Sequence, residues 1–247
     1  MISITDLSKN YGKFVAVDHI SFRVKKGEIC SFLGVNGAGK TTTLRMLAGI
    51  LLPSTGSIEI DGISLAQNPR EAKRITGYIP DRPYLYPRLT GREYLSFVSD
   101  LYDLEDRYAE ERIDLLLEEY RLVEWQDTLI ESYSHGMKQR LAVCAGLVHE
   151  PHALIVDEPM VGLDPHGAKL LKQRFRDYAS RGMSLLISTH SLNVAEEISD
   201  HIVMIHRGKI IIDGPLTDIR KQREFHDRNL ESIFLELTTH EVAGGAE

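Results

Sequence analysis

Hydrophobic and polar residues alternate over short stretches near the start of the chain. Residues 2–7 and 19–24 show this period of two, which predicts half-buried antiparallel strands. Residues 29–33 are more continuously apolar and run into glycines, as a buried parallel strand does. A helical period follows over residues 40–48. Two further short strands are predicted, over residues 57–60 and 76–79.

The pattern changes to a helical period between residues 90 and 149. Thr90 and Glu93 form a capping-box pattern at the start of one helix, and residues 106–120 predict a second helix. These helices interrupt a chain of strands on either side. We therefore predict an inserted helical lobe over about residues 82–149.

Strands and helices alternate again after this lobe, which predicts a mostly parallel sheet covered on both faces. The predicted strands are residues 153–156, 184–188, 202–205 and 209–212, and the predicted helices are residues 167–179 and 192–199. The expected fold class is therefore α/β, with an antiparallel β part at the start. One domain over residues 1–220 is followed by a tail, 221–247, with a helix over 229–237 and an expected frayed end at 242–247.

Composition narrows the classes of function. The 247 residues are 43% hydrophobic and 26% charged, which is typical of a soluble globular protein with a substantial core. The formal net charge of -7 argues against nucleic acid as a partner. No signal segment opens the chain, and no apolar run approaches the roughly 18 to 20 residues that span a bilayer. Cys30 and Cys144 lie in apolar runs, so we expect both in the core.

A phosphate-binding loop follows the predicted strand 29–33. Residues 34–41 fit the pattern G-x-x-x-x-G-K-[ST], between a strand and a helix as that loop requires. Its backbone N–H groups can surround a polyphosphate, Lys40 can reach the β and γ phosphates, and Thr41 offers a hydroxyl to Mg²⁺. The candidate nucleotide-binding residues here are Gly34, Val35, Asn36, Gly37, Ala38, Gly39, Lys40, Thr41 and Thr42.

A pair of carboxylates ends the apolar strand that begins at residue 153. The C-terminal ends of parallel strands meet at one edge of a sheet, so this pair is expected beside the phosphate loop. Asp157 is then suited to hold Mg²⁺, and Glu158 to orient and polarise an attacking water. ATP and Mg²⁺ are the expected cofactors.

Ser134 is a favourable N-cap for a helix that runs toward residue 148. Its hydroxyl and the free N–H groups of the helix converge on one spot, which can bind an anion. The segment Tyr-Ser-His-Gly-Met-Lys-Gln-Arg at 133–140 resembles the signature motif of the ABC ATPase family. That resemblance implies that Ser134 and Gly136 meet the γ-phosphate of ATP bound to an opposite subunit, so that two copies hold two nucleotides head to tail.

The resemblance to the ABC ATPase family extends over essentially the whole chain. It implies that adenine stacks on Tyr11, and that the loop 162–165 runs along the dimer interface. It also implies that His190 contacts the γ-phosphate and supports Glu158, so Lys40, Glu158 and His190 are the expected catalytic residues. The second ATPase is expected to be a copy of this chain or a related subunit.

Two motifs of this chain depart from the usual form in this family. Asp81 stands where the family's coupling loop usually has a glutamine, so it is either a further Mg²⁺ ligand or a contact to a membrane partner. The signature also differs from the common Leu-Ser-Gly-Gly-Gln form, at Tyr133, His135 and Met137. These variants resemble ATP-binding subunits of the ABC-2 type, which are mainly exporters.

The resemblance implies an ATPase that powers transport through separate membrane subunits, from the inner face of the cell membrane. One alternative is a soluble ABC ATPase that acts on ribosomes or DNA, but the sequence has no internal repeat or sustained heptads that such proteins usually carry. Another is a regulatory module that binds ATP and barely hydrolyses it. The full set Lys40, Asp157, Glu158 and His190 counts against the last alternative.

Overall fold

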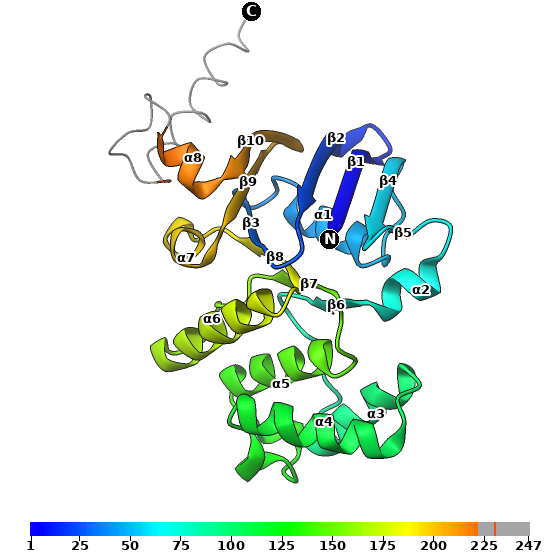
Figure 1. Cartoon of the computed structure of the whole chain (residues 1–247), viewed down its shortest axis with the longest axis vertical. Coiled ribbons are helices and arrows are strands. Elements are labelled where there is room, and N and C mark those ends of the chain that lie inside the picture. Colours follow the sequence, from blue (N-terminus) through cyan, green and yellow to red (C-terminus); the bar gives the residue numbers. More distant parts are fainter. Residues whose placement is uncertain (222–229, 231–247) are drawn as a thin grey trace, which may run out of the picture.

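The computed structural model describes residues 1–221 and residue 230, and the strands of this part form two sheets (Figure 1). Sheet A is antiparallel, in the order β2 (Phe14–Val24), β1 (Ile2–Tyr11), β4 (Thr55–Ile60) and β5 (Ile63–Ser64). Sheet B has the order β10 (Lys209–Pro215), β9 (His201–His206), β3 (Ile29–Leu33), β8 (Ser184–Thr189), β7 (Ala153–Asp157) and β6 (Thr76–Ile79). Sheet B is parallel from β9 to β6, and only its edge strand β10 is antiparallel.

Sheet B is covered on both faces, as the alternation of strands and helices predicts. Alternate residues of β7 separate the two cores: Ile155 belongs to the cluster that contains α1 (Lys40–Leu47) and sheet A, whereas Leu154 belongs to the cluster on the other side, with α6 (Pro165–Ser180). The helix α7 (Leu192–Ile198) also contacts β3 and β8. Burying both faces explains why the central strands are continuously apolar.

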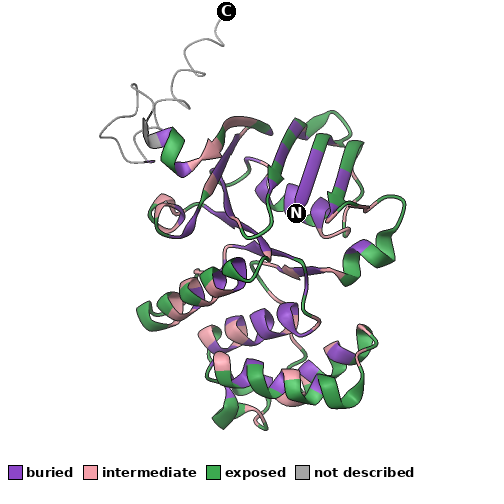
Figure 2. Cartoon of the chain, viewed as in Figure 1, coloured by how far each residue is buried: buried purple, intermediate pink, exposed green. Residues whose placement is uncertain are grey.

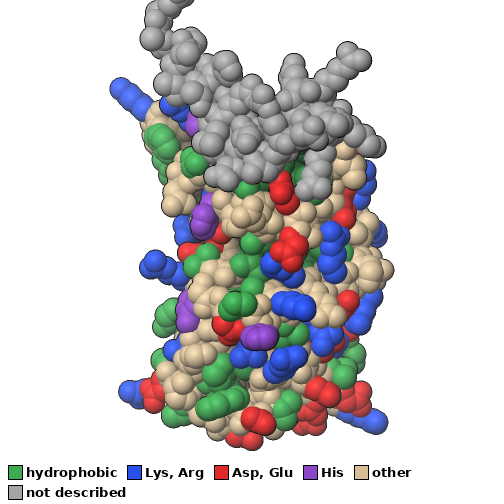
Figure 3. Space-filling view, turned by 90° about the vertical axis from the view of Figure 1, so that its left-hand side faces the viewer, with side chains coloured by type: hydrophobic (Ala, Val, Ile, Leu, Met, Phe, Trp, Pro, Cys, Tyr) green, Lys and Arg blue, Asp and Glu red, His purple; other side chains and the backbone are tan. Residues whose placement is uncertain are grey.

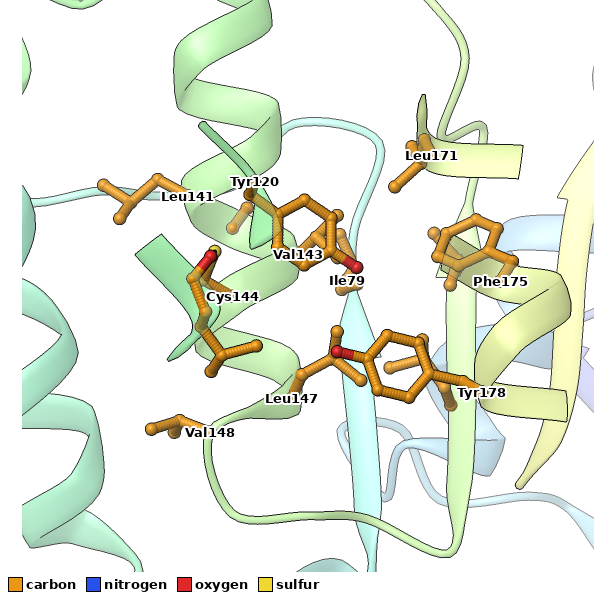
Figure 4. Close-up of a cluster of buried hydrophobic side chains, with 14 of the residues drawn as sticks. Ile79, Tyr120, Leu141, Val143, Cys144, Leu147, Val148, Leu171, Phe175 and Tyr178 are labelled. Carbon is orange, nitrogen blue, oxygen red and sulfur yellow. The ribbon is translucent and has the colours of Figure 1, made fainter. Parts of the chain in front are cut away.

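A helical lobe packs beside sheet B. It contains α3 (Gly91–Leu101), α4 (Asp106–Glu119), α5 (His135–Leu147) and the 3-10 turns Val123–Trp125 and Ile130–Ser132. The capping box at Thr90 is confirmed. Figure 4 shows the junction with the rest of the molecule, where Val143 and Leu147 of α5 approach Ile79 and Tyr178. Figure 2 shows this inner side of α5 buried, while the outer helices of the lobe are largely exposed.

Several details differ from the sequence predictions. Residues 2–7 lie in an antiparallel strand, as predicted, but their burial does not alternate, because Ser3 is buried together with its neighbours and an irregularity around Asp6, where φ is 51°, interrupts the pairing of β1. β2 begins five residues before the predicted start. β5 and α2 (Pro69–Arg74) were not predicted, since elements of two and six residues leave almost no period to detect.

The last helix within the continuously described residues is α8 (Leu216–Lys221). Leu230 packs with α8 and β9, but the rest of the helix predicted over 229–237 and the end at 242–247 lie outside the described residues. The division into a domain over 1–220, a lobe over about 82–149 and a tail over 221–247 stays a prediction. No helix among the described residues is long and apolar enough to span a membrane.

Candidate nucleotide site

The phosphate loop joins β3 to α1 and depends on two glycines that tolerate no side chain. A Cβ at Gly34 would lie 2.5 Å from the carbonyl oxygen of Ile205, and one at Gly39 would lie 2.6 Å from that of Ala16. Gly39 also has φ of 113°, a left-handed value that favours glycine, and it is the N-cap of α1. The loop therefore winds tightly between neighbouring backbones and leads directly into the N-terminus of a helix.

Lys40 turns back over the loop that precedes it. Its ammonium donates hydrogen bonds to the carbonyl oxygens of Gly34 (2.6 Å) and Val35 (3.4 Å), and lies 4.0 Å from Oε1 of Glu158. The side chain is only 7% exposed. Burial lowers the pKa of Lys40, and the carboxylates of Glu158 and Asp157 oppose that shift. The loop thus holds the ammonium of Lys40 in place, and this group has a further N–H that can donate to an anionic ligand.

Asp157 ends β7 next to the first turn of α1. It is 2% exposed, and its Oδ2 accepts a hydrogen bond from Oγ1 of Thr41 at 3.0 Å. Its other oxygen, Oδ1, accepts from the hydroxyl of Ser188, at the end of β8. Ser188 was not predicted as a site residue, because only the pairing of β7 with β8 brings it to Asp157. The hydroxyl and carboxylate oxygens fit Mg²⁺, which is usually held by one or two carboxylates together with phosphate oxygens.

Glu158 and His190 meet beyond the ends of adjacent strands. The Nδ1 atom of His190 lies 2.9 Å from Oε1 of Glu158, and donates to it when the carboxylate is ionised. The backbone N–H of Glu158 donates to the carbonyl of Ser188 at 3.0 Å. Glu158 adopts φ of 49°, which is uncommon for a residue with a side chain, and such backbone strain is concentrated at functional sites. A carboxylate held this firmly is suited to orient a water molecule.

A hollow of about 260 Å³ lies beside the phosphate loop. Tyr11, at the end of β1, lines it and is 50% exposed, with Nζ of Lys9 at 5.4 Å from its ring centroid. Phe14, which opens β2, lines the same hollow and is 63% exposed. Phe14 was missed because the predicted strand began at residue 19. The remaining lining residues are Ala16, Val35, Asn36, Gly37, Gly39, Lys40, Thr41 and Thr42.

Ser134 and Gly136 lie elsewhere, at the start of α5 in the helical lobe (Figure 1). Ser134 is the predicted N-cap, and its side chain accepts from the N–H of Met137 at 3.3 Å. Ser134 is exposed, and no residue of α5 is among the described residues that line the hollow beside Tyr11. One chain therefore does not bring its own Ser134 to its own phosphate loop.

Asp81 lies two residues beyond the end of β6, at the same edge of sheet B as Asp157. Its side chain is half exposed and forms a long ion pair, 4.0 Å, with Nε of Arg82. Within residues 1–221 and 230, no three His, Cys, Asp or Glu side chains are grouped closely enough to hold a metal ion. The structure thus does not bring Asp81 together with two other such side chains, and its role as a ligand stays a prediction.

Comparison with known proteins identifies relatives along the chain. A family model described as "ABC transporter" matches residues 17–161. The "ABC-type transporter ATP-binding protein EcsA" of Bacillus subtilis (strain 168) is 34% identical over 242 residues, which cover 98% of both chains. The "Bacitracin transport ATP-binding protein BcrA" of Bacillus licheniformis is 38% identical over 243 residues, which cover 96% of this chain and 78% of that protein.

A solved structure agrees with the fold throughout. It is described as "Structure of ATP binding subunit of ABC transporter", has a TM-score of 0.90 and is 35% identical in sequence. The match covers 96% of this chain and 99% of that one. The arrangement of sheets A and B and the helical lobe is therefore shared with an ATP-binding subunit.

Proposed function

This chain belongs to the ABC transporter family as one of its ATP-binding and ATP-hydrolysing subunits, and we propose that it powers export across a membrane through separate transmembrane permease subunits. The proposal of export is supported by the resemblance to ABC-2 subunits and by a relative whose name states bacitracin transport. Such a subunit would lie in the cytoplasm, peripheral on the inner face of the cell membrane.

In the proposed mechanism, adenine stacks on Tyr11, and the loop 34–42 binds the phosphates. Lys40 neutralises the β and γ phosphates, and Glu158 accepts a proton from the attacking water while His190 fixes its orientation. Thr41 and Asp157 would hold Mg²⁺, which supplies charge neutralisation for phosphoryl transfer. Asp81 is proposed as a third contact to this ion or to the permease.

The site is proposed to be completed by a second copy of the chain or a related ATPase. The exposed N-terminus of α5, with Ser134 and Gly136, offers a hydroxyl and free N–H groups for the γ-phosphate of the opposite subunit. Closing two chains on two nucleotides and opening them after hydrolysis would move the helical lobes. The permease subunits would receive that motion, and they would also determine the substrate.

The observation that carries the hydrolytic mechanism is the contact of His190 with Glu158, beside the buried pair of Thr41 and Asp157. We expect Glu158→Gln to lower kcat for ATP by about 100-fold or more, because the amide cannot accept the proton of the attacking water. The measurement is steady-state ATPase activity of the purified chain. Glu59→Gln, on an exposed position of β4, is the matched control and should keep wild-type activity.

A second measurement addresses transport itself. We expect the chain to co-purify with a polytopic membrane protein, and we expect Glu158→Gln to form a dimer only when ATP is added.

A wild-type rate of ATP hydrolysis in Glu158→Gln would contradict the role of Glu158 as the base. Recovery on ribosomes or DNA in place of a membrane protein would instead favour the soluble class of ABC ATPase.

A further inference from the structure

His135 is the third residue of the variant signature segment, where it follows Ser134 and begins α5. Its Nε2 atom lies 3.3 Å from the carbonyl oxygen of Val161. A carbonyl only accepts hydrogen bonds, so Nε2 carries the proton in this contact. The imidazole thus reaches out of the helical lobe to the loop between β7 and α6.

The same imidazole covers Gly162. A Cβ at Gly162 would lie 2.4 Å from Cδ2 and 2.6 Å from Nε2 of His135, so the ring rests directly on the backbone of that residue. Gly136 extends the contact, because a Cβ there would lie 3.5 Å from Cδ2 of Leu163. The first turn of α5 is therefore packed along residues 161–163.

Those residues lead straight back to the proposed base. The N–H of Val161 donates to the carbonyl of Glu158 at 3.3 Å, and the N–H of Leu163 donates to the carbonyl of Met160 at the same distance. Both bonds are long, so they hold the turn weakly on their own. Glu158 also adopts a left-handed backbone conformation, which persists only where neighbouring contacts support it.

We propose that His135 is a positioning residue, which holds loop 158–164 against the start of α5 and so transmits engagement of Ser134 by a nucleotide on the second subunit to Glu158 of its own chain. The inference rests on the proposed dimer and on the proposed role of Glu158. His190 contacts the carboxylate of Glu158 directly, and His135 contacts the loop at the carbonyl of Val161.

The first test measures the loop without using activity. Hydrogen exchange in the full-length chain should be faster at the amides of Val161 and Leu163 in His135→Ala than in wild type. His135→Gln should restore slow exchange, because its amide can donate to the Val161 carbonyl. Equal exchange in wild type and His135→Ala would overturn the proposal, even if Glu158 is the base.

The second test measures coupling in the ATPase. We expect His135→Ala to lower kcat about tenfold, which is less than the roughly 100-fold loss that a displacement of about 1 Å can cause, while KM for ATP stays within about twofold. The Hill coefficient should fall toward one, and His135→Gln should recover most of both losses. His166→Ala, an exposed histidine in the first turn of α6, is the control and should match wild type.

Contrary outcomes of the second test are distinct. A rise in KM with unchanged kcat would mean that His135 binds nucleotide itself, and would overturn the positioning role. Equal losses in His135→Ala and His135→Gln would also overturn it, since the donor would then not matter. The failure of Glu158→Gln to slow hydrolysis would count against the proposed base, whereas the exchange experiment judges the His135 contact independently of it.

Discussion

The edge of sheet B that carries the phosphate loop differs in one respect from the start of α5. At the sheet edge, polar groups are already paired within the chain: Asp157 accepts from Thr41 and Ser188, and Glu158 contacts His190. At the start of α5, Ser134 is exposed and caps only its own helix. Folding therefore organises one half of the proposed site, whereas the other half presents its donors outward.

The largest effect is expected when two defective chains are mixed. Lys40→Ala should weaken ATP binding about 10- to 100-fold, because it removes a charged donor. Ser134→Ala should leave the binding of ATP to a single chain unchanged, but it should prevent hydrolysis in the dimer. A mixed head-to-tail dimer has one site with both residues intact. ATPase activity should therefore reappear on mixing.

The control for this mixture is Lys40→Ala combined with the double variant Lys40→Ala, Ser134→Ala, which leaves no intact site. Activity should then stay absent. If the first mixture also stays inactive while both chains form dimers, each site would have to be completed within its own chain, and the contrast between the two regions would be wrong.

The next prediction concerns His149, which lies where the helical lobe joins sheet B. It follows α5, its Nε2 lies 3.3 Å from the carbonyl of Thr76, and its ring stacks on Tyr102. Burial lowers the pKa of His149 from 6.5 to about 4. Between these pH values the unfolded chain binds more protons than the folded chain. The free energy of unfolding should therefore fall by about 3 kcal/mol as the pH is lowered from above 6.5 to 4.

Urea unfolding from pH 7 to pH 4 measures this loss. His149→Gln keeps an amide donor toward Thr76 and removes the titration, so its free energy of unfolding should fall less steeply with acid. His19→Gln should give no such relief, because the hydrogen bond with Asp6 raises the pKa of His19 and favours the folded state in acid. If the free energy of unfolding of His149→Gln fell as steeply with acid as that of wild type, His149 would not be the cause of the loss.

The smallest effect is expected on ATP binding, from the two aromatic residues that line the hollow, Tyr11 and Phe14. Removing the ring in Tyr11→Ala should weaken ATP binding about tenfold, which is the usual loss of one base stack. Phe14→Ala should weaken it less, because Phe14 is the more exposed of the two. Titration with a fluorescent ATP analogue measures both, with Phe97→Ala on α3 as the control. A larger loss in Phe14→Ala would make Phe14 the adenine platform.

The sequence predicted most of the sheet edge because its signals are local. The pattern of residues 34–41 demands a strand before it and a helix after it, and both are present as β3 and α1. The N-cap at Ser134 and the capping box at Thr90 also depend only on residues within one helical turn, and both are confirmed. Short elements such as α2 were not predicted, because they bury too few residues to show a hydrophobic period.

Ser188, Phe14 and His135 show what needed the folded chain. Ser188 reaches Asp157 through the pairing of β8 with β7, and Phe14 reaches the phosphate loop through a strand that begins earlier than predicted. His135 appeared in the sequence only as a departure from the signature. Its contact with Val161 joins residues 26 positions apart, and no local pattern encodes such a distance.

Consecutive residues encode the class of this protein, because the backbone requirements of a phosphate loop and the carboxylates at a strand end are local features of the chain. The folded chain decides which groups meet across strands and between the lobe and the sheet. That decision follows from burial of apolar faces on both sides of sheet B, which fixes strand order and helix position and leaves polar contacts such as His190 with Glu158 as consequences.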